Sequence, residues 1–113
     1  MDIAQTMQEV HETAVEKGWW TTERSVAEVL ANIHAEVAEA WEDYRDGYPL
    51  AEWVASAAQS ILGKPTGFPT ELADILIRVF DAAAAWGIDL EGALRAKMEY
   101  NQTRPYRHGG KLA

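Results

Sequence analysis

Two stripes of acidic residues stand at helical spacing in this sequence. The first stripe lies between residues 26 and 45 and contains Asn32, Glu36, Glu39 and Asp43. The second stripe lies between residues 70 and 87 and contains Glu71, Asp74, Arg78 and Asp81. Acidic pairs three residues apart are common on solvated helix faces, so the spacing alone predicts little. These two stripes differ from other acidic pairs because each runs beside an apolar face.

The apolar residues around both stripes predict that the carboxylates lie against a protein core. In the segment that carries the first stripe, residues 26–45, the expected core face consists of Val26, Val29, Leu30, Ile33, Val37, Ala40 and Tyr44. The opposite side carries alanines instead of charges, which indicates packing on both sides and therefore an oligomer. The second helix is expected to be buried nearly all round, because apolar residues surround its stripe from Leu72 to Trp86.

Carboxylates buried in this way need a compensating charge, because an unpaired buried charge strongly disfavours folding. One interpretation is that Arg78 forms ion pairs with Asp74 and Asp81 along its own helix. The other is that the two stripes meet across a helix pair, where clustered carboxylates repel one another unless they bind a divalent cation. The residues by themselves leave both interpretations open.

The last helical segment carries cations on the face that its apolar residues turn inward. Leu90, Ala93 and Leu94 set that face, and the same phase continues to Lys97, Tyr100, Asn101 and Arg104. Lys and Arg beside a carboxylate cluster can bind phosphate oxygens that a metal also contacts. Metal-bound carboxylates with adjacent cations favour attack of water on a phosphoryl group. A ferritin-like iron site is not expected, because none of the three histidines follows a Glu by three residues.

Glycine and proline breaks divide the chain into five expected helical segments. They span about 3–17, 25–45, 50–62, 70–87 and 89–104. Ser25 and Glu28 match a capping box, and Thr70 and Asp89 are expected to cap the last two helices. A basic tail that contains glycine, residues 106–113, follows Pro105.

Composition limits the kind of metal and the kind of partner. The chain has no cysteine, so a metal must bind oxygen or imidazole ligands, which favours Mg²⁺ or Mn²⁺. A net charge of −8 disfavours binding to nucleic acid or to an anionic membrane surface. The N-terminal residues lack the pattern of a signal peptide, and no apolar run reaches the ~20 residues of a membrane span. We therefore expect a cytoplasmic globular protein.

At Glu36-x-x-Glu39 followed by Glu71-x-x-Asp74, the sequence resembles the MazG-like branch of the all-alpha NTP pyrophosphatases. Three further segments resemble that family in the expected order: residues 11–20, 71–78 and 97–111. The resemblance covers nearly the whole chain. The gap between the two acidic pairs is longer than in compact members, because residues 50–69 form an insertion that changes the expected pocket.

The resemblance implies residue roles. It implies that Glu36, Glu39, Glu71 and Asp74 are catalytic and bind Mg²⁺, for which Mn²⁺ can substitute. It implies that the triphosphate is held, often in a site shared with a neighbouring subunit, by Lys97, Tyr100, Asn101 and Arg104. For the substrate pocket we expect Lys17, Trp20 and Asn32, and Trp19 falls in the same region.

The sequence therefore predicts an all-α protein, a four- to five-helix bundle of the all-alpha NTP pyrophosphatase type assembled as a homodimer or homotetramer. Residues 1–105 are expected to form a single catalytic domain, followed by the 106–113 tail. The expected reaction is Mg²⁺-dependent hydrolysis of a (d)NTP to (d)NMP and pyrophosphate. The alternative is a non-catalytic helical interaction module with a structural cation site.

Overall fold

The computed structural model describes residues 1–55 and 63–113, and in these ranges the chain is helical apart from its connections and one isolated bridge. The helices are α1 (Ile3–Glu16), α2 (Val26–Arg45), α3 (Phe68–Ala85), α4 (Leu90–Thr103) and the single turn α5 (Arg107–Gly110). The predicted all-α class is confirmed. No helix in the described ranges combines the length and apolarity needed to cross a bilayer.

Local signals place most helix starts where the sequence predicts them. The Ser25 hydroxyl accepts a hydrogen bond from the backbone N–H of Glu28 at 3.1 Å, and Asp89 accepts one from Gly92 at 3.0 Å. Both residues therefore cap the orphan donors of a first turn. The expected cap at Thr70 is wrong, because α3 begins earlier, after Gly67. Thr70 instead donates its hydroxyl hydrogen to the Gly67 carbonyl.

The expected helix over 50–62 is wrong where the chain is described. Residues 50–55 form a turn and an extended stretch in which Val54 pairs with Thr66 through backbone hydrogen bonds of 2.9 and 3.0 Å. A short isolated helix is marginal, whereas this pairing satisfies the backbone N–H and C=O groups of Val54 and Thr66. The remaining part of the prediction, residues 56–62, lies outside the described residues.

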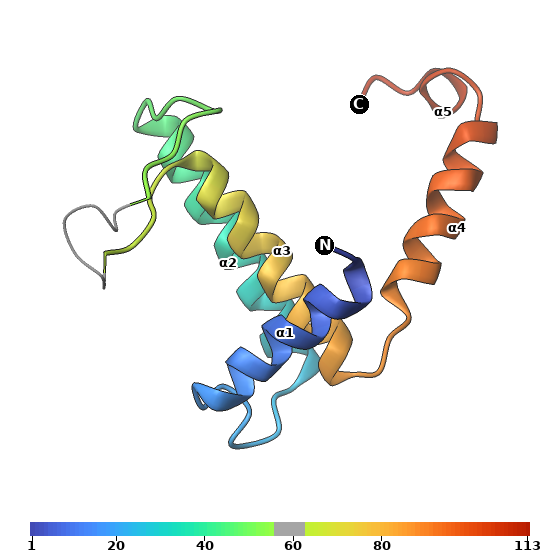
Figure 1. Ribbon diagram of the computed structural model, residues 1–113. Coiled ribbons are helices and arrows are strands. Elements are labelled where there is room, and N and C mark those ends of the chain that lie inside the picture. The colour runs from blue at the N-terminus through green and yellow to red at the C-terminus, as the bar shows by residue number, and fades with distance from the viewer. Residues whose placement is uncertain (56–62) are drawn as a thin grey trace.

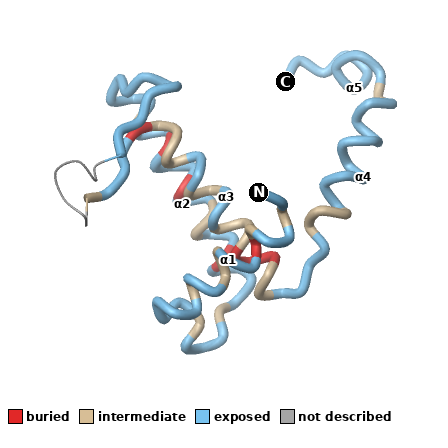
Figure 2. The backbone as a smooth tube through the Cα atoms, in the orientation of Figure 1, coloured by how far each residue is buried: buried red, intermediate tan, exposed pale blue. Residues whose placement is uncertain are grey.

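Helix α3 is the centre of the packing. It lies alongside α2 with the opposite chain direction, and α1 crosses it (Figure 1). Within the described residues, the buried ones lie on α1, α2 and α3 (Figure 2) and at Gly67, and α4 contributes none. Helix α4 packs mainly against α1. The Cα radius of gyration is 16.8 Å, against about 13 Å for a compact domain of this length, so a single chain is open.

The predicted core face of α2 is only partly correct. The residues turned toward α3 are Val29, Ile33, Glu36 and Ala40, whereas Val26, Leu30, Val37 and Tyr44 are about half exposed. The buried face of α2 differs from the predicted one because the acidic edge of the helix, not the middle of its apolar stripe, lies against α3. The expectation that α3 is buried nearly all round is also wrong for one chain, since Leu72, Leu76 and Ile77 are 46–54% exposed.

Candidate active site

Three of the four predicted metal ligands come together between α2 and α3. One carboxylate oxygen each of Glu36, Glu71 and Asp74 lies within 4.8 Å of the other two. Glu36 is 8% exposed, and the other two are half-buried. Two antiparallel helices achieve this because each carries its acidic residues on the face turned toward the other helix. We call Glu36, Glu71 and Asp74 the carboxylate cluster.

The cluster contains more negative charge than its protein neighbours neutralise. Burial raises the pKa of Glu71, and the carboxylates of Asp43, Glu39 and Asp74 raise it further. Burial and Glu36 raise the pKa of Asp74 against the opposing charges of Lys64 and Arg78. Mutual repulsion of this kind is relieved by protonation or by a cation.

One oxygen of the cluster has no hydrogen-bond partner among the described residues. Glu71 Oε2 is buried and accepts no hydrogen bond, although a buried acceptor is normally satisfied. Three oxygen ligands with an unsatisfied lone-pair site fit a hard divalent cation such as Mg²⁺ or Mn²⁺. The residues present therefore suit the metal that the sequence predicts.

Glu39 stands at the edge of the cluster instead of inside it. It is exposed, its carboxylate raises the pKa of Glu71, and it lines the cleft in front of the cluster. That position would let Glu39 complete a ligand set or orient a water molecule, because its carboxylate is accessible from the cleft.

Arg78 compensates the cluster across helices, not along its own. Its Nε donates to Glu36 Oε1 at 3.0 Å, and its guanidinium lies 5.7 Å from the Trp19 ring centroid. The interpretation that Arg78 forms ion pairs with Asp74 and Asp81 along its own helix is wrong, because the side chain extends toward α2. Among the described residues Arg78 forms its ion pair with Glu36, whereas Glu71 and Asp74 form none.

A cleft of about 420 Å³ opens in front of the carboxylate cluster. Its walls include Lys17, Trp19, Glu39 and Lys64. Lys17, which the sequence predicts for the substrate pocket, therefore lines the same cleft as Glu36 and Asp74. Lys64 was not predicted, since a lysine in a glycine- and proline-rich connection gives no sign of its neighbours until the chain folds back onto α3.

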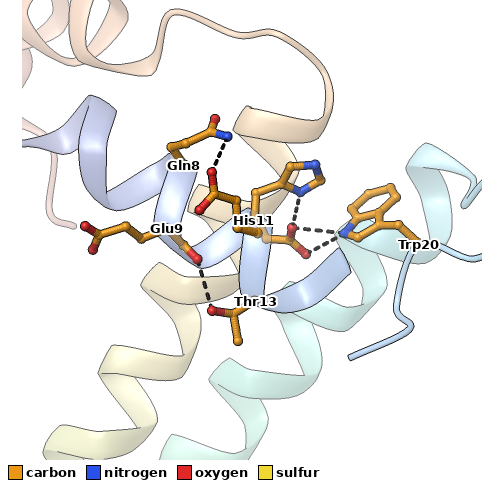
Figure 3. A network of polar contacts seen from close by, with 7 residues as sticks. Gln8, Glu9, His11, Thr13 and Trp20 are labelled. Carbon is orange, nitrogen blue, oxygen red and sulfur yellow. Dashed lines mark hydrogen bonds and ion pairs between the residues drawn. The ribbon is translucent and has the colours of Figure 1, made fainter. Parts of the chain in front are cut away.

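Trp20 and Asn32, the other predicted pocket residues, do not line this cleft. The Trp20 indole N–H donates to both oxygens of Asp81, at 3.0 and 3.1 Å, and His11 Nδ1 lies 2.8 Å from Asp81 Oδ1 (Figure 3). Asp81 thus belongs to a polar network with α1 and the following loop, not to the cluster. Asn32 is half-buried one turn before Glu36.

Three of the four predicted phosphate-binding residues lie on α4 and the fourth, Arg104, is its C-cap; none of them lines the cleft of its own chain. Lys97 Nζ and Arg104 Cζ lie 5.5 and 5.6 Å from the Tyr100 ring centroid, so two cations share one aromatic ring. Asn101 lies on the same helix and is exposed. The tertiary structure therefore separates this cationic face from the carboxylate cluster within one chain.

The fold and the cluster together define the class: an all-helical protein with a carboxylate site suited to a divalent cation. The chain is similar to the dATP/dGTP diphosphohydrolase of cyanophage S-2L, with 33% identity over 82 residues that cover 73% of this chain and 78% of the phage protein. At that identity and coverage, the chain belongs to the family of the phage enzyme. No protein-family model matches the chain, and no solved structure matches it significantly.

Proposed function

We propose that this protein is a MazG-like nucleoside triphosphate pyrophosphohydrolase that uses Mg²⁺ to convert a (d)NTP and water into (d)NMP and pyrophosphate. The carboxylate cluster is the observation that carries the proposal, because three carboxylate oxygens within 4.8 Å and one unsatisfied buried oxygen fit a divalent cation. The similarity to a dATP/dGTP diphosphohydrolase supports a triphosphate substrate.

The proposed roles follow from the position of each side chain. Glu36, Glu71 and Asp74 hold the cation, and Glu39, exposed at the cleft, completes the ligand set or orients the attacking water. Arg78 keeps Glu36 in place. A bound Mg²⁺ supplies Lewis-acid activation of water and of the phosphate oxygens. Attack at the α-phosphorus breaks its bond to the bridging oxygen, and pyrophosphate leaves with the bonding electrons.

We further propose that α4 serves the carboxylate cluster of a neighbouring copy in a homodimer or homotetramer. Val26, Leu30, Val37 and Trp41 expose an apolar face on α2, and an exposed apolar patch of this kind marks an interaction surface. An assembly would cover it and bring Lys97, Tyr100, Asn101 and Arg104 toward a triphosphate. Light scattering should give a mass at least twice the 12.6 kDa of the chain, and a monomer would contradict this part.

The central experiment measures products with each canonical triphosphate, with Mg²⁺ and with a chelator. Pyrophosphate and monophosphate should form only with the metal. Orthophosphate with a diphosphate would place attack at the γ-phosphorus and contradict the proposed geometry. No turnover with any nucleotide would leave the non-catalytic module with a structural cation site.

The role of α4 has its own test. Lys97→Ala or Arg104→Ala should cost ~2–4 kcal/mol of transition-state stabilisation, similarly for every base, because each removes one charge-stabilising group. Arg95→Ala, on the same helix but outside the predicted set, is the control and should change the rate little. Mixing inactive Asp74→Asn and Arg104→Ala proteins should restore part of the activity if the site is shared between copies.

A further inference from the structure

A second cavity opens on the other side of Asp74, where the chain folds back onto the start of α3. Its volume is about 440 Å³, within the roughly 300–1,000 Å³ of small-molecule sites. Its wall is mostly apolar and includes Trp53, Pro65, Pro69 and Ile77. Such a surface suits a flat, uncharged ring.

Local structure holds Trp53 at this place. The Val54–Thr66 pairing ties its backbone to the segment before α3. Gly67 has φ +132°, and a Cβ there would lie 2.7 Å from the Glu52 carbonyl oxygen and 2.9 Å from Trp53 Cα. Only glycine permits that approach without displacement. The backbone of Trp53 is therefore fixed, while its side chain remains 56% exposed and free to stack with a ligand.

The second cavity adjoins the cleft in front of the carboxylate cluster. Lys64, Asp74 and Ile77 line both. A molecule with an aromatic ring in the second cavity could therefore place an anionic group beside Asp74 and the cation that the cluster would hold. Lys64 stands where the two parts of such a molecule would meet, and its charge acts on Asp74.

The alternative aromatic surface, Trp19, is already engaged. The Arg78 guanidinium lies over its ring, and Arg78 is held by Glu36. Stacking a base on that face would compete with a contact that positions a cluster residue. Trp53 carries no such partner among the described residues.

We propose that this second cavity binds the nucleobase of the substrate, with Trp53 as the stacking surface and Lys64 contacting the phosphate nearest the sugar. This assignment rests on the proposed function. It deepens that function by giving base recognition to the cavity beside Trp53 and Pro65 instead of to the side of Trp20.

Binding can be measured without turnover. The chain has five tryptophans, whose indole N–H signals are resolvable by NMR, and Trp53→Phe identifies the signal of Trp53. Nucleoside monophosphates added in chelator should shift that signal more than those of Trp19 and Trp20. A shift confined to Trp19 or Trp20, or no shift of Trp53 at saturation, would overturn the proposal even if the protein hydrolysed no triphosphate.

Kinetics supply the second readout. Trp53→Ala should raise KM about 5- to 100-fold, the usual range for one lost base–aromatic stack, with a smaller change in kcat. Trp53→Ala should also reduce the differences in KM among the bases. Trp53→Phe should retain most of the affinity and Trp53→Leu should not. Lys64→Ala should weaken all bases equally, and Trp86→Ala is the control for loss of a partly exposed indole.

Three results would overturn the assignment in an active enzyme. In the first, Trp53→Ala leaves the order of KM values among the bases unchanged. In the second, Trp19→Ala removes the differences among the bases instead. In the third, Trp53→Ala dissociates the oligomer without changing that order. The last result would make the cavity a contact between copies. Failure of the proposed function is a separate observation, the absence of metal-dependent turnover in the wild-type protein.

Discussion

The two ends of α3 place carboxylates in opposite situations. Asp81, 8% exposed, accepts from Trp20 and meets His11, so both of its oxygens have protein partners. Two turns earlier, Asp74 faces Glu36, and Glu71 has a buried oxygen with no partner. Acidic residues of one helix therefore form a fully hydrogen-bonded network near one end. Near the other end they form a site whose negative charges repel one another.

The difference shows what distinguishes a ligand site from a structural carboxylate. Burial is similar at Glu36 and Asp81, so burial does not decide it. What differs is how completely donors satisfy the oxygens. Trp20 donates to both oxygens of Asp81, whereas Arg78 donates to one oxygen of Glu36. Glu71 Oε2 accepts from no described residue. A satisfied carboxylate stabilises the fold, whereas a repelling cluster requires a further cation. The following predictions test that distinction.

The largest expected difference is in turnover. Asp74→Asn should lower the rate by about 100- to 1,000-fold, the scale of one lost electrostatic group in an active site. Asp81→Asn should change the rate of the folded protein by much less, because its oxygens do not join the cluster. Pyrophosphate release at saturating substrate measures both, with circular dichroism as the folding control. Equal losses in the two variants would erase the distinction.

Stabilisation of the folded protein by metal should depend on Asp74 and not on Asp81. A cation at 100 times its Kd adds about 2.7 kcal/mol to the free energy of unfolding. Thermal unfolding with and without Mg²⁺ should show this in the wild-type protein and in Asp81→Asn, and should lose it in Asp74→Asn. Full stabilisation of Asp74→Asn would place the cation elsewhere.

The structural network should matter most for stability. Asp81→Asn replaces an acceptor with a donor beside Trp20 and His11, so it should lower the free energy of unfolding by about 1–3 kcal/mol. Asp46→Asn, an exposed change at the end of α2, serves as the control. Urea unfolding followed by tryptophan fluorescence measures both. A loss of stability in Asp46→Asn as large as in Asp81→Asn would contradict the structural role.

The smallest effect concerns pH. Because the pKa of Glu71 is raised above its ordinary 4.5, the folded protein holds this proton more tightly than the unfolded chain. That contribution to stability is complete below 4.5 and is lost as the pH rises through the folded-state pKa. In chelator, Glu71→Gln should therefore match the wild type in acid and exceed it at neutral pH. A wild-type protein more stable than Glu71→Gln at neutral pH would contradict the proposed repulsion among the carboxylates.

Local spacing in the sequence was sufficient to predict the all-α class and the caps at Ser25 and Asp89. The stripes that contain Glu36, Glu71 and Asp74 could be singled out because each runs beside an apolar face. These depend on local geometry, since a helix places residues three and four apart on one face whatever packs against it. Because the two acidic pairs lie on separate helices, the sequence also predicted that they could face each other across a helix pair.

Partners distant in the sequence were decided by the tertiary structure alone. Nothing local to Asp81 distinguishes it from Asp74 in the same stripe. Their environments differ because α1 and its loop bring His11 and Trp20 to Asp81, while α2 brings Glu36 to Asp74. The rotation of α2, the reach of Arg78 to Glu36 and the return of Trp53 onto α3 have the same origin. Each depends on which faces of separate segments pack together, and helical periodicity fixes the faces but not their pairing.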